Sequence, residues 1–353
     1  MRDLGMFTAK TAIVTTAVMT AFSLIIIIPT FLLLGLLVAS IGGSASNTTV
    51  FGPGSASHTF LAIPVKGIIE GTQSESSDPF GLSAQDTAYG YAIKKKLYQA
   101  AKDNSVDGIM LDIDSPGGTI YGSRAIADGV AHYKQKTNKP VYAFISGLGA
   151  SGGYWAAASA DKIIVDYGST VGSIGVISGP FKFYDRPTAE DGGILTGGVV
   201  TQNGIETVTL TAGKSKDIGN PYRRLTQSEI SALQAGLNNE YEDFVSYVSQ
   251  RRGIDQATLR DQIGALIYDS RSATAARLTD VVAPREEAYG LLADAAAVPR
   301  RDFNVVETVA DSGTHSLATT LLGRKQETPK ASLCGESTIL FAFYGSVDSL
   351  CKT

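Results

Sequence analysis

The chain has 353 residues, of which 44% are hydrophobic and 18% are charged, and its formal net charge is −4. This length is sufficient for one large domain, or two smaller ones, with a buried core. Because no surplus of basic residues is available to neutralise phosphates, the composition excludes nucleic acid as an expected partner.

The first predicted element is a long apolar segment near the N-terminus. Residues 11–41 carry no charge, and about 20 apolar residues are enough to cross a bilayer. A cleaved signal peptide is the alternative, because small residues follow, but its apolar part is usually only about 7–15 residues long. Arg2 and Lys10 precede the segment, and the next basic residue is Lys66. This asymmetry predicts that residues 1–10 are cytosolic, that 11–41 anchor the chain in the cell membrane, and that the rest lies outside the cytosol.

A folded domain is expected after a linker. Residues 42–59 are rich in Gly, Ser and Thr, which predicts a flexible tether, and the domain is expected over residues 60–300. Three apolar runs bounded by Gly or Pro have the composition of strands. They are FLAIPVKGII (60–69), VDGIMLDID (106–114) and PVYAFIS (140–146).

A helix is predicted between the last two runs. Ile126, Val130 and Tyr133 recur at helical spacing, with polar residues between them. Strand, helix and strand in this order predict a βαβ unit in a mostly parallel, buried sheet, and so an α/β fold. Residues 161–177 predict one more short strand and a glycine-rich turn. The alternating run IETVTLTAG (205–213) predicts another strand.

Two loops follow predicted strands of this sheet, DSPGGT (114–119) and GLGASGG (147–153). Chemistry in such sheets collects at the carboxyl ends of the strands. The second loop places Ser151 near the start of a predicted helix, where free backbone N–H groups stabilise developing negative charge. The flanking glycines permit unusual backbone angles. Alternatively, Ser151 is an ordinary helix cap or loop serine.

A nucleophilic serine also needs a general base. The chain has three histidines, His58, His132 and His315. None of them lies in a loop that resembles a site, so a Ser-His-Asp triad is not predicted. Lysine can act instead when burial lowers its pKa from about 10.4 toward neutrality. Lys214 and Lys216 follow the run 205–213, although each taken alone is typical of a surface lysine.

Four segments in order resemble signature blocks of the signal peptide peptidase A family, membrane-bound Ser/Lys peptidases related in fold to Clp protease and crotonases. The segments are LDIDSPGGTIYGS (111–123), ISGLGASGGYWAAASADKIIVDYGSTVGSIGVI (145–177), TAGKSKDIGNPYRRLTQSE (211–229) and ALIYDSRSATAARLTDVV (265–282). The resemblance extends from about Phe60 to Leu292. It implies a Clp protease/crotonase-like α/β fold with repeated ββα units, preceded by one transmembrane helix.

The resemblance also implies roles for individual residues. Ser151 would be the nucleophile and Lys216 the general base, with Lys214 the lesser candidate. The supporting residues that it implies are the oxyanion-hole donors Gly118 and Gly152 and the lysine-orienting Ser173. The expected reaction is hydrolysis of signal-peptide remnants or other apolar membrane-derived peptides through an acyl-enzyme, with no cofactor and no metal. The alternatives are a related Ser/Lys quality-control protease, a crotonase-type acyl-CoA enzyme and a catalytically silent membrane scaffold.

The resemblance also predicts how the protein assembles. The chain has one set of the SGG and GSIGV segments, as in the short form of the family, which implies a homo-oligomer, such as an octamer, that shares sites between subunits.

Residues 301–353 are expected to form a tail whose apolar run TILFAFYG (338–345) lies between Cys334 and Cys351. The two cysteines form a disulfide or stay as free thiols. The apolar run docks on the sheet or occupies the substrate groove.

Overall fold

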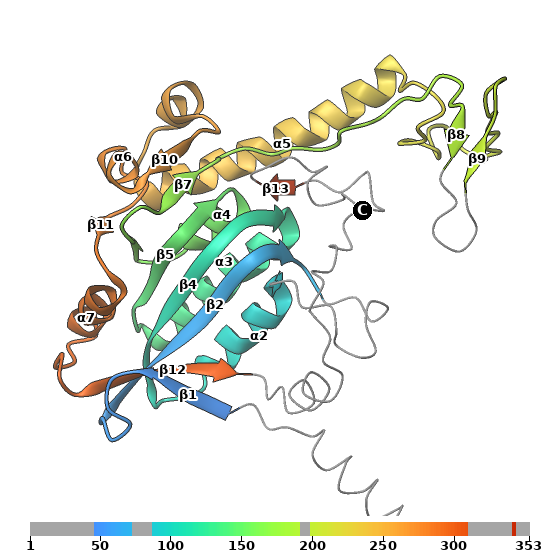
Figure 1. Ribbon diagram of the computed structural model, residues 1–353. Coiled ribbons are helices and arrows are strands. Elements are labelled where there is room, and N and C mark those ends of the chain that lie inside the picture. Colours follow the sequence, from blue (N-terminus) through green and yellow to red (C-terminus); the bar gives the residue numbers. More distant parts are fainter. Residues whose placement is uncertain (1–45, 73–86, 191–197, 310–340, 344–353) are drawn as a thin grey trace, which may run out of the picture. The chain divides into compact units, whose positions relative to one another are not determined.

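The computed structural model of the protein describes residues 46–72, 87–190, 198–309 and 341–343 (Figure 1). The chain divides into two units, one of Met1–Thr48 with Thr308–Gln326 and one of Thr49–Glu307 with Glu327–Thr353. The described residues of the first unit are the outer ends of strands β1 (Ser46–Phe51) and β12 (Phe303–Val309). There the Thr308 hydroxyl donates a hydrogen bond of 3.1 Å to Asn47 Oδ1. The features described below belong to the second unit.

A largely parallel sheet forms the centre of this unit (Figure 1). Its main row has the order β12-β2-β4-β5-β6-β11, and neighbouring strands in this row are parallel. The further strands of the row are β2 (His58–Glu70), β4 (Val106–Thr119), β5 (Val141–Ala150), β6 (Lys162–Val165) and β11 (Val281–Val282).

Short strands extend this row. Strand β1 lies beside β12, β3 (Thr87–Tyr89) pairs with β2, and β7 (Thr170–Gly172) pairs with β5. Two further strands run antiparallel to their partners, namely β10 (Ile267–Asp269) on β7 and β13 (Phe341–Phe343) on β4. Strands β8 (Ala189–Glu190) and β9 (Val199–Val200) form a separate antiparallel pair.

Helices and buried side chains cover both faces of the sheet. The helices are α2 (Gly90–Ala100), α3 (Ile120–Thr137), α4 (Gly152–Ala157), α5 (Gln227–Arg252), α6 (Ser270–Ala275) and α7 (Arg285–Ala295), with a π-helical turn at Thr258–Ile263. One core cluster joins β4 and β5 to α2, α3, α4 and the C-terminal part of α5, and the other joins them to α7. Successive residues of β4 enter opposite clusters, as Ile109 and Met110 do. Burial on both faces explains why these strands read as continuous apolar runs.

The predicted α/β architecture is confirmed in its main features. The three apolar runs form β2, β4 and β5, and the helix between the last two is α3, in which Ile126, Val130 and Tyr133 are fully buried. The parallel-rich sheet with helices packed against it fits the expected Clp protease/crotonase-like fold.

The strand predicted over residues 205–213 is wrong. The segment has no regular secondary structure, and its apolar side chains are exposed, Val208 by 72% and Leu210 by 92%. Alternating polarity produces a strand only where an edge is available to pair with its N–H and C=O groups. Within the described part of one chain, this segment pairs with no such edge.

The flexible linker expected over residues 42–59 and the tail expected from residue 301 also differ from the structure. Residues Ser46–Phe51 form β1, and β12 continues the sheet beyond residue 300. The ring centroid of Phe51 lies 5.2 Å from that of Tyr289 and 5.7 Å from that of Phe303. These aromatic contacts account for the position of β1, because burial of large rings outweighs the flexibility that Gly and Ser confer nearby.

Several predictions fall outside the described residues. They concern the anchor at 11–41, the third histidine, His315, and the two cysteines, Cys334 and Cys351. Among the residues that the structure does describe, no helix is both long enough and apolar enough to span a membrane.

Candidate active site

Ser151 occupies the junction between β5 and α4 in an unusual backbone conformation. Its φ is 53° and its ψ is −117°, a combination that L-residues rarely adopt, and the residue is completely buried. Its N–H donates to Gly172 O at 2.8 Å, and its Oγ donates to Gly175 O at 3.4 Å. A conformation of this kind costs about 1–3 kcal/mol and persists only where the surrounding structure enforces it.

Helix α4 holds this junction in place through its packing. All six of its residues are buried. The Trp155 ring stacks on Phe244 of α5 with 4.4 Å between the centroids, and Tyr154 Oη donates to Leu278 O at 2.8 Å. Burial raises the pKa of Tyr154 and keeps the phenol neutral. The helix fixes the position of Ser151, but it is too short to have a large dipole.

The predicted DSPGGT loop forms the end of β4 beside Ser151. Ser115 pairs with Gly149 in the ladder between β4 and β5, and a Cβ on Gly153 would lie 2.8 Å from Ser115 O. The Ser115 hydroxyl donates to Gly67 O at 2.6 Å and accepts the N–H of Gly117 at 3.1 Å. The structure therefore brings the two predicted loops side by side.

Gly118 lies in this loop against β2. A Cβ at this position would collide with the Ile69 carbonyl, so the close approach of the two strands requires glycine. Strand β13 runs antiparallel along the same segment, with Gly117 opposite Phe343, Gly118 opposite Ala342 and Thr119 opposite Phe341. Residues 341–343 of the tail therefore dock on the sheet, at the residue expected to bind the oxyanion.

Ser173 is also brought near Ser151. It lies just after β7, with a φ of 53° and its N–H donating to Leu266 O at 2.8 Å. The neighbouring Gly172 pairs with Ala150, and Gly175, two residues further on, accepts the Ser151 hydroxyl. Ser151, Gly152, Ser173 and the loop with Gly118 thus form one cluster of the predicted site residues.

The two candidate lysines lie elsewhere. Lys214 and Lys216 are exposed on a turn that precedes α5. The residues on either side of Lys216 are linked to the first turn of that helix. Ser215 hydrogen-bonds to Glu229 directly, and Asp217 hydrogen-bonds to Arg223, which in turn donates to Glu229.

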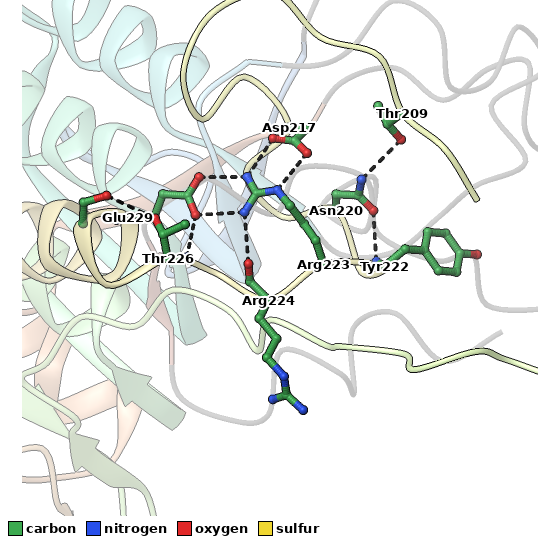
Figure 2. Close-up of polar contacts among 9 residues, drawn as sticks. Thr209, Asp217, Asn220, Tyr222, Arg223, Arg224, Thr226 and Glu229 are labelled. Carbon is green, nitrogen blue, oxygen red and sulfur yellow. Dashed lines mark hydrogen bonds and ion pairs between the residues drawn. The ribbon is translucent and has the colours of Figure 1, made fainter. Parts of the chain in front are cut away.

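A set of polar residues at the start of α5 explains this anchoring (Figure 2). We call Asp217, Arg223, Thr226 and Glu229 the α5 cap cluster. Arg223 donates two hydrogen bonds to the Asp217 carboxylate, of 2.7 and 2.8 Å, and two to the Glu229 carboxylate, of 2.8 and 2.9 Å. Thr226 and Glu229 form a reciprocal capping box. Hydrogen bonds from Arg223 lower the pKa of both carboxyl groups.

The length of α5 separates Lys216 from Ser151 within one chain. Glu229 marks the start of the helix, and Phe244 marks the part that packs against Trp155. The 15 residue steps from Glu229 to Phe244 span about 22 Å of helix at about 1.5 Å per residue. The structure therefore does not bring Lys216 to the Ser151 of its own chain.

The described histidines have partners away from this cluster. His58 Nδ1 lies 2.8 Å from Asp107 Oδ2, and the His132 ring stacks on Tyr98 with 3.7 Å between the centroids. Within the described ranges, no three His, Cys, Asp or Glu residues are grouped so that they could hold a metal ion.

Two sets of residues were not identified from the sequence, one at the start of α5 and one beside Ser151. The pattern of Thr226 followed three residues later by Glu229 is a capping-box signal, which was available in the sequence. The structural roles of Asp114 and Ser115 had no such signal, because they depend on how β4 and β5 pair.

Comparisons with known proteins show that the chain is similar to peptidases. Residues 133–299 match the family model described as peptidase family S49. The chain is 37% identical over 198 residues to a protein of Methanocaldococcus jannaschii named as a protease, a match that covers 56% of this chain and 58% of that one. It is 29% identical over 315 residues to an Enterococcus faecium protein named as signal peptide peptidase SppA, covering 83% and 85%.

A third relative, Protease 4 of Haemophilus influenzae, is 32% identical over 177 residues, which are 50% of this chain and 26% of the relative. The chain therefore spans less than two thirds of the archaeal and Haemophilus proteins, and most of the length of the enterococcal one.

Proposed function

We propose that the chain is a member of peptidase family S49, whose model matches residues 133–299, and that it is a serine endopeptidase with Ser151 as its nucleophile and Lys216 as its general base. The observation that carries the assignment of Ser151 is its conformation. Ser151 is buried at a strand-to-helix junction beside a glycine loop, and its φ is positive. An ordinary helix cap does not require such a strained conformation.

The proposed chemistry is acyl transfer. Neutral Lys216 takes the proton of Ser151 Oγ, which attacks the peptide carbonyl, and the lysine returns the proton to the leaving amine. The N–H groups of Gly118 and Gly152 stabilise the oxyanion, by about 3 kcal/mol for each donor. Water then hydrolyses the acyl-enzyme, again with Lys216 as base. Ser173 orients the lysine amine.

The geometry of one chain supports a site shared between subunits. Lys216 lies on the turn that precedes α5, and the segment before it exposes the apolar side chains of Val208 and Leu210. An exposed apolar segment of this kind is suited to burial against a second copy of the chain. We propose that each Ser151 receives its Lys216 from a neighbouring subunit of a homo-oligomer.

The proposed substrates are apolar peptides in extended form, such as signal-peptide remnants. The antiparallel pairing of β13 with Gly117–Thr119 supports this proposal, because it demonstrates that this edge of β4 accepts an extended segment through backbone hydrogen bonds. Membrane anchoring through residues 11–41, with the peptidase domain outside the cytosol, would place the enzyme beside such peptides.

A fluorophosphonate probe tests the nucleophile. We expect the full chain in detergent to be labelled at Ser151, and we expect Ser151→Ala to remain unlabelled. A parent protein that resists labelling in its assembled state would favour the silent-scaffold alternative. Hydrolysis of a synthetic signal peptide, compared with an unfolded soluble protein, separates a signal-peptide peptidase from a quality-control protease.

Mixing two inactive variants tests the shared site. Ser151→Ala retains Lys216, and Lys216→Ala retains Ser151, so co-assembled oligomers contain some sites with both residues. We expect the mixture to regain activity that neither variant has alone. If the co-assembled mixture stays inactive, the lysine does not come from a neighbour.

A further inference from the structure

Asp114 lies where β4 and β5 lose their regular pairing. Ile113 pairs with Ile145 and Ser115 with Gly149, so one residue of β4 faces residues 146–148 of β5. An irregularity of this kind leaves backbone groups without a partner in the ladder. The unpaired residues lead directly to Ser151.

Side chains supply the missing partners. Asp114 Oδ1 accepts the N–H of Leu148 at 3.0 Å, and Ser169 Oγ accepts the N–H of Gly147 at 2.9 Å. Gly147 has a φ of +94°, and a Cβ at this position would lie 2.7 Å from Asp114 Oδ1. The Asp114 carboxylate therefore packs directly against Gly147, where the positive φ and the close contact require glycine.

Asp114 and the next residue fasten both loops of the candidate site. Asp114 holds the loop before Ser151, whereas Ser115 holds the glycine turn through its bonds to Gly67 O and the Gly117 N–H. Two adjacent residues of β4 thus connect the nucleophile loop and the loop that carries Gly118.

The hydrogen bond between Leu148 and Asp114 affects the position of Ser151 through the pairing of β5 with β7. Residues Leu148–Ala150 pair with β7, and Gly172 O of that strand accepts the Ser151 N–H at 2.8 Å. A slip of one residue in this pairing would turn the Ser151 side chain to the opposite face. The Asp114 carboxylate fixes the register immediately before this stretch.

We infer that Asp114 is a positioning residue, whose carboxylate sets the register of residues 146–150 and so holds Ser151 in its strained conformation beside the Gly118 loop. The carboxylate does not reach the reacting atoms. The catalytic consequence of this inference rests on the proposed function, but the structural consequence does not.

The test compares three variants of the full chain. Asp114→Ala removes the acceptor, whereas Asp114→Asn keeps one oxygen that can accept from Leu148. Asp103→Ala is the matched control, because Asp103 is another exposed carboxylate that accepts a backbone N–H, that of Ser105 at 2.9 Å. The measurements are the rate of fluorophosphonate labelling, kcat and KM for a peptide, and amide hydrogen exchange over residues 146–151.

We expect Asp114→Ala to be labelled about tenfold more slowly than the parent, with a similar fall in kcat and a KM changed by less than about twofold. Asp114→Asn and Asp103→Ala should stay within about threefold of the parent. Exchange over residues 146–151 should accelerate in Asp114→Ala alone.

The inference would be overturned if Asp114→Ala were labelled as fast as the parent. It would also be overturned if the labelling rate of Asp103→Ala fell as much as that of Asp114→Ala. If the parent itself is not labelled, the proposed function fails, and the exchange data still decide the inference. Unchanged exchange over residues 146–151 in Asp114→Ala would then reject it.

Discussion

At the scale of single residues, Ser151 combines complete burial with a backbone conformation that favours glycine. Its N–H donates to Gly172 of β7 and its hydroxyl to Gly175 beyond that strand, whereas its carbonyl accepts the N–H of Trp155 in α4. The position therefore stores strain that packing elsewhere in the domain must offset.

Replacing Ser151 in two ways separates this strain from the chemistry. Ser151→Ala and Ser151→Gly both remove the hydroxyl, so both should abolish labelling and hydrolysis. Only glycine adopts a positive φ without strain. We therefore expect the free energy of unfolding in urea to be about 1 kcal/mol higher for Ser151→Gly than for Ser151→Ala. Equal unfolding free energies for the two variants would mean that the conformation is not strained.

Single residues also differ in how far the sequence could predict them. Ser151 and Gly118 stand in recognisable motifs, and their places at the ends of β5 and β4 follow from the order of strands and helices. The collision that forces glycine at position 118 involves Ile69, which belongs to a strand far away in sequence. A contact of this kind becomes visible only when the register of the sheet is known.

At the scale of elements, α5 has two unlike halves. Phe244, Val245 and Val248 are buried, whereas Glu229 is the only buried residue before them. The C-terminal half belongs to the core through Trp155. The N-terminal half extends the helix toward β8 and β9, away from the sheet (Figure 1).

Truncations in the two halves should have different effects. Phe244→Ala removes a fully buried ring from the Trp155 stack, and we expect it to lower the free energy of unfolding by about 3–5 kcal/mol. Ile230→Ala, at a position 44% exposed, should change it by less than about 0.5 kcal/mol. Urea unfolding followed by Trp155 fluorescence measures both. A large loss for Ile230→Ala in a dissociated chain would contradict this division.

Acid should loosen the start of α5 before the rest of the domain. Hydrogen bonds from Arg223 lower the pKa of Glu229 and Asp217 in the folded chain. Their stabilisation is therefore complete above the unfolded pKa of about 4 and is lost as pH falls below that value toward the folded pKa.

Hydrogen exchange of residues 215–230, corrected for intrinsic rates at pH 6 and pH 3.5, measures this loss. The protection of these residues should fall more than that of β4 and β5. Glu229→Gln should already show low protection at pH 6. Glu242→Gln, on the same helix, removes a surface ion pair with Arg260 of the π-helical turn and should not lower the protection. Uniform loss of protection across the domain would contradict a local effect.

Strands that pair with other strands of the same chain could be predicted from the sequence. The structure of a segment without such a pairing partner could not. The runs that became β2, β4 and β5 are buried on both faces, so composition alone identified them. The run 205–213 has the alternation of a strand but no strand beside it within the described residues. The irregular pairing at Asp114 depends on the relative lengths of two neighbouring strands, which no local pattern encodes.

At the scale of the whole molecule, the structure brings most of the predicted site residues together but leaves Lys216 apart from them. Ser151, Gly152, Ser173 and the Gly118 loop are gathered by the sheet, since all of them follow strands that pair with one another. Lys216 is placed by α5 and its cap cluster instead, outside the sheet. Under the proposed function, a complete Ser/Lys pair would therefore depend on assembly, which a single sequence does not specify.

The tail also gives a prediction at this scale. Ala342→Pro should break the pairing of β13 with Gly118, because proline cannot take part fully in a ladder. We expect the variant to hydrolyse peptides with a lower KM than the parent, and kcat should not change. Ala331→Pro, outside β13, is the control. An unchanged KM in Ala342→Pro would mean that β13 and the substrate do not use the same edge.

Under the proposed function, the pairing of β13 with β4 would also make the peptidase its own competitor. A segment that is covalently joined to the domain acts at an effective concentration that its connection sets, independent of how much protein is present. Dilution would not remove such a competitor from its own chain, whereas a peptide that pairs better with Gly117–Thr119 would displace it. Access to Ser151 would then be governed by the strength of backbone pairing, so that only segments able to become fully extended gain entry.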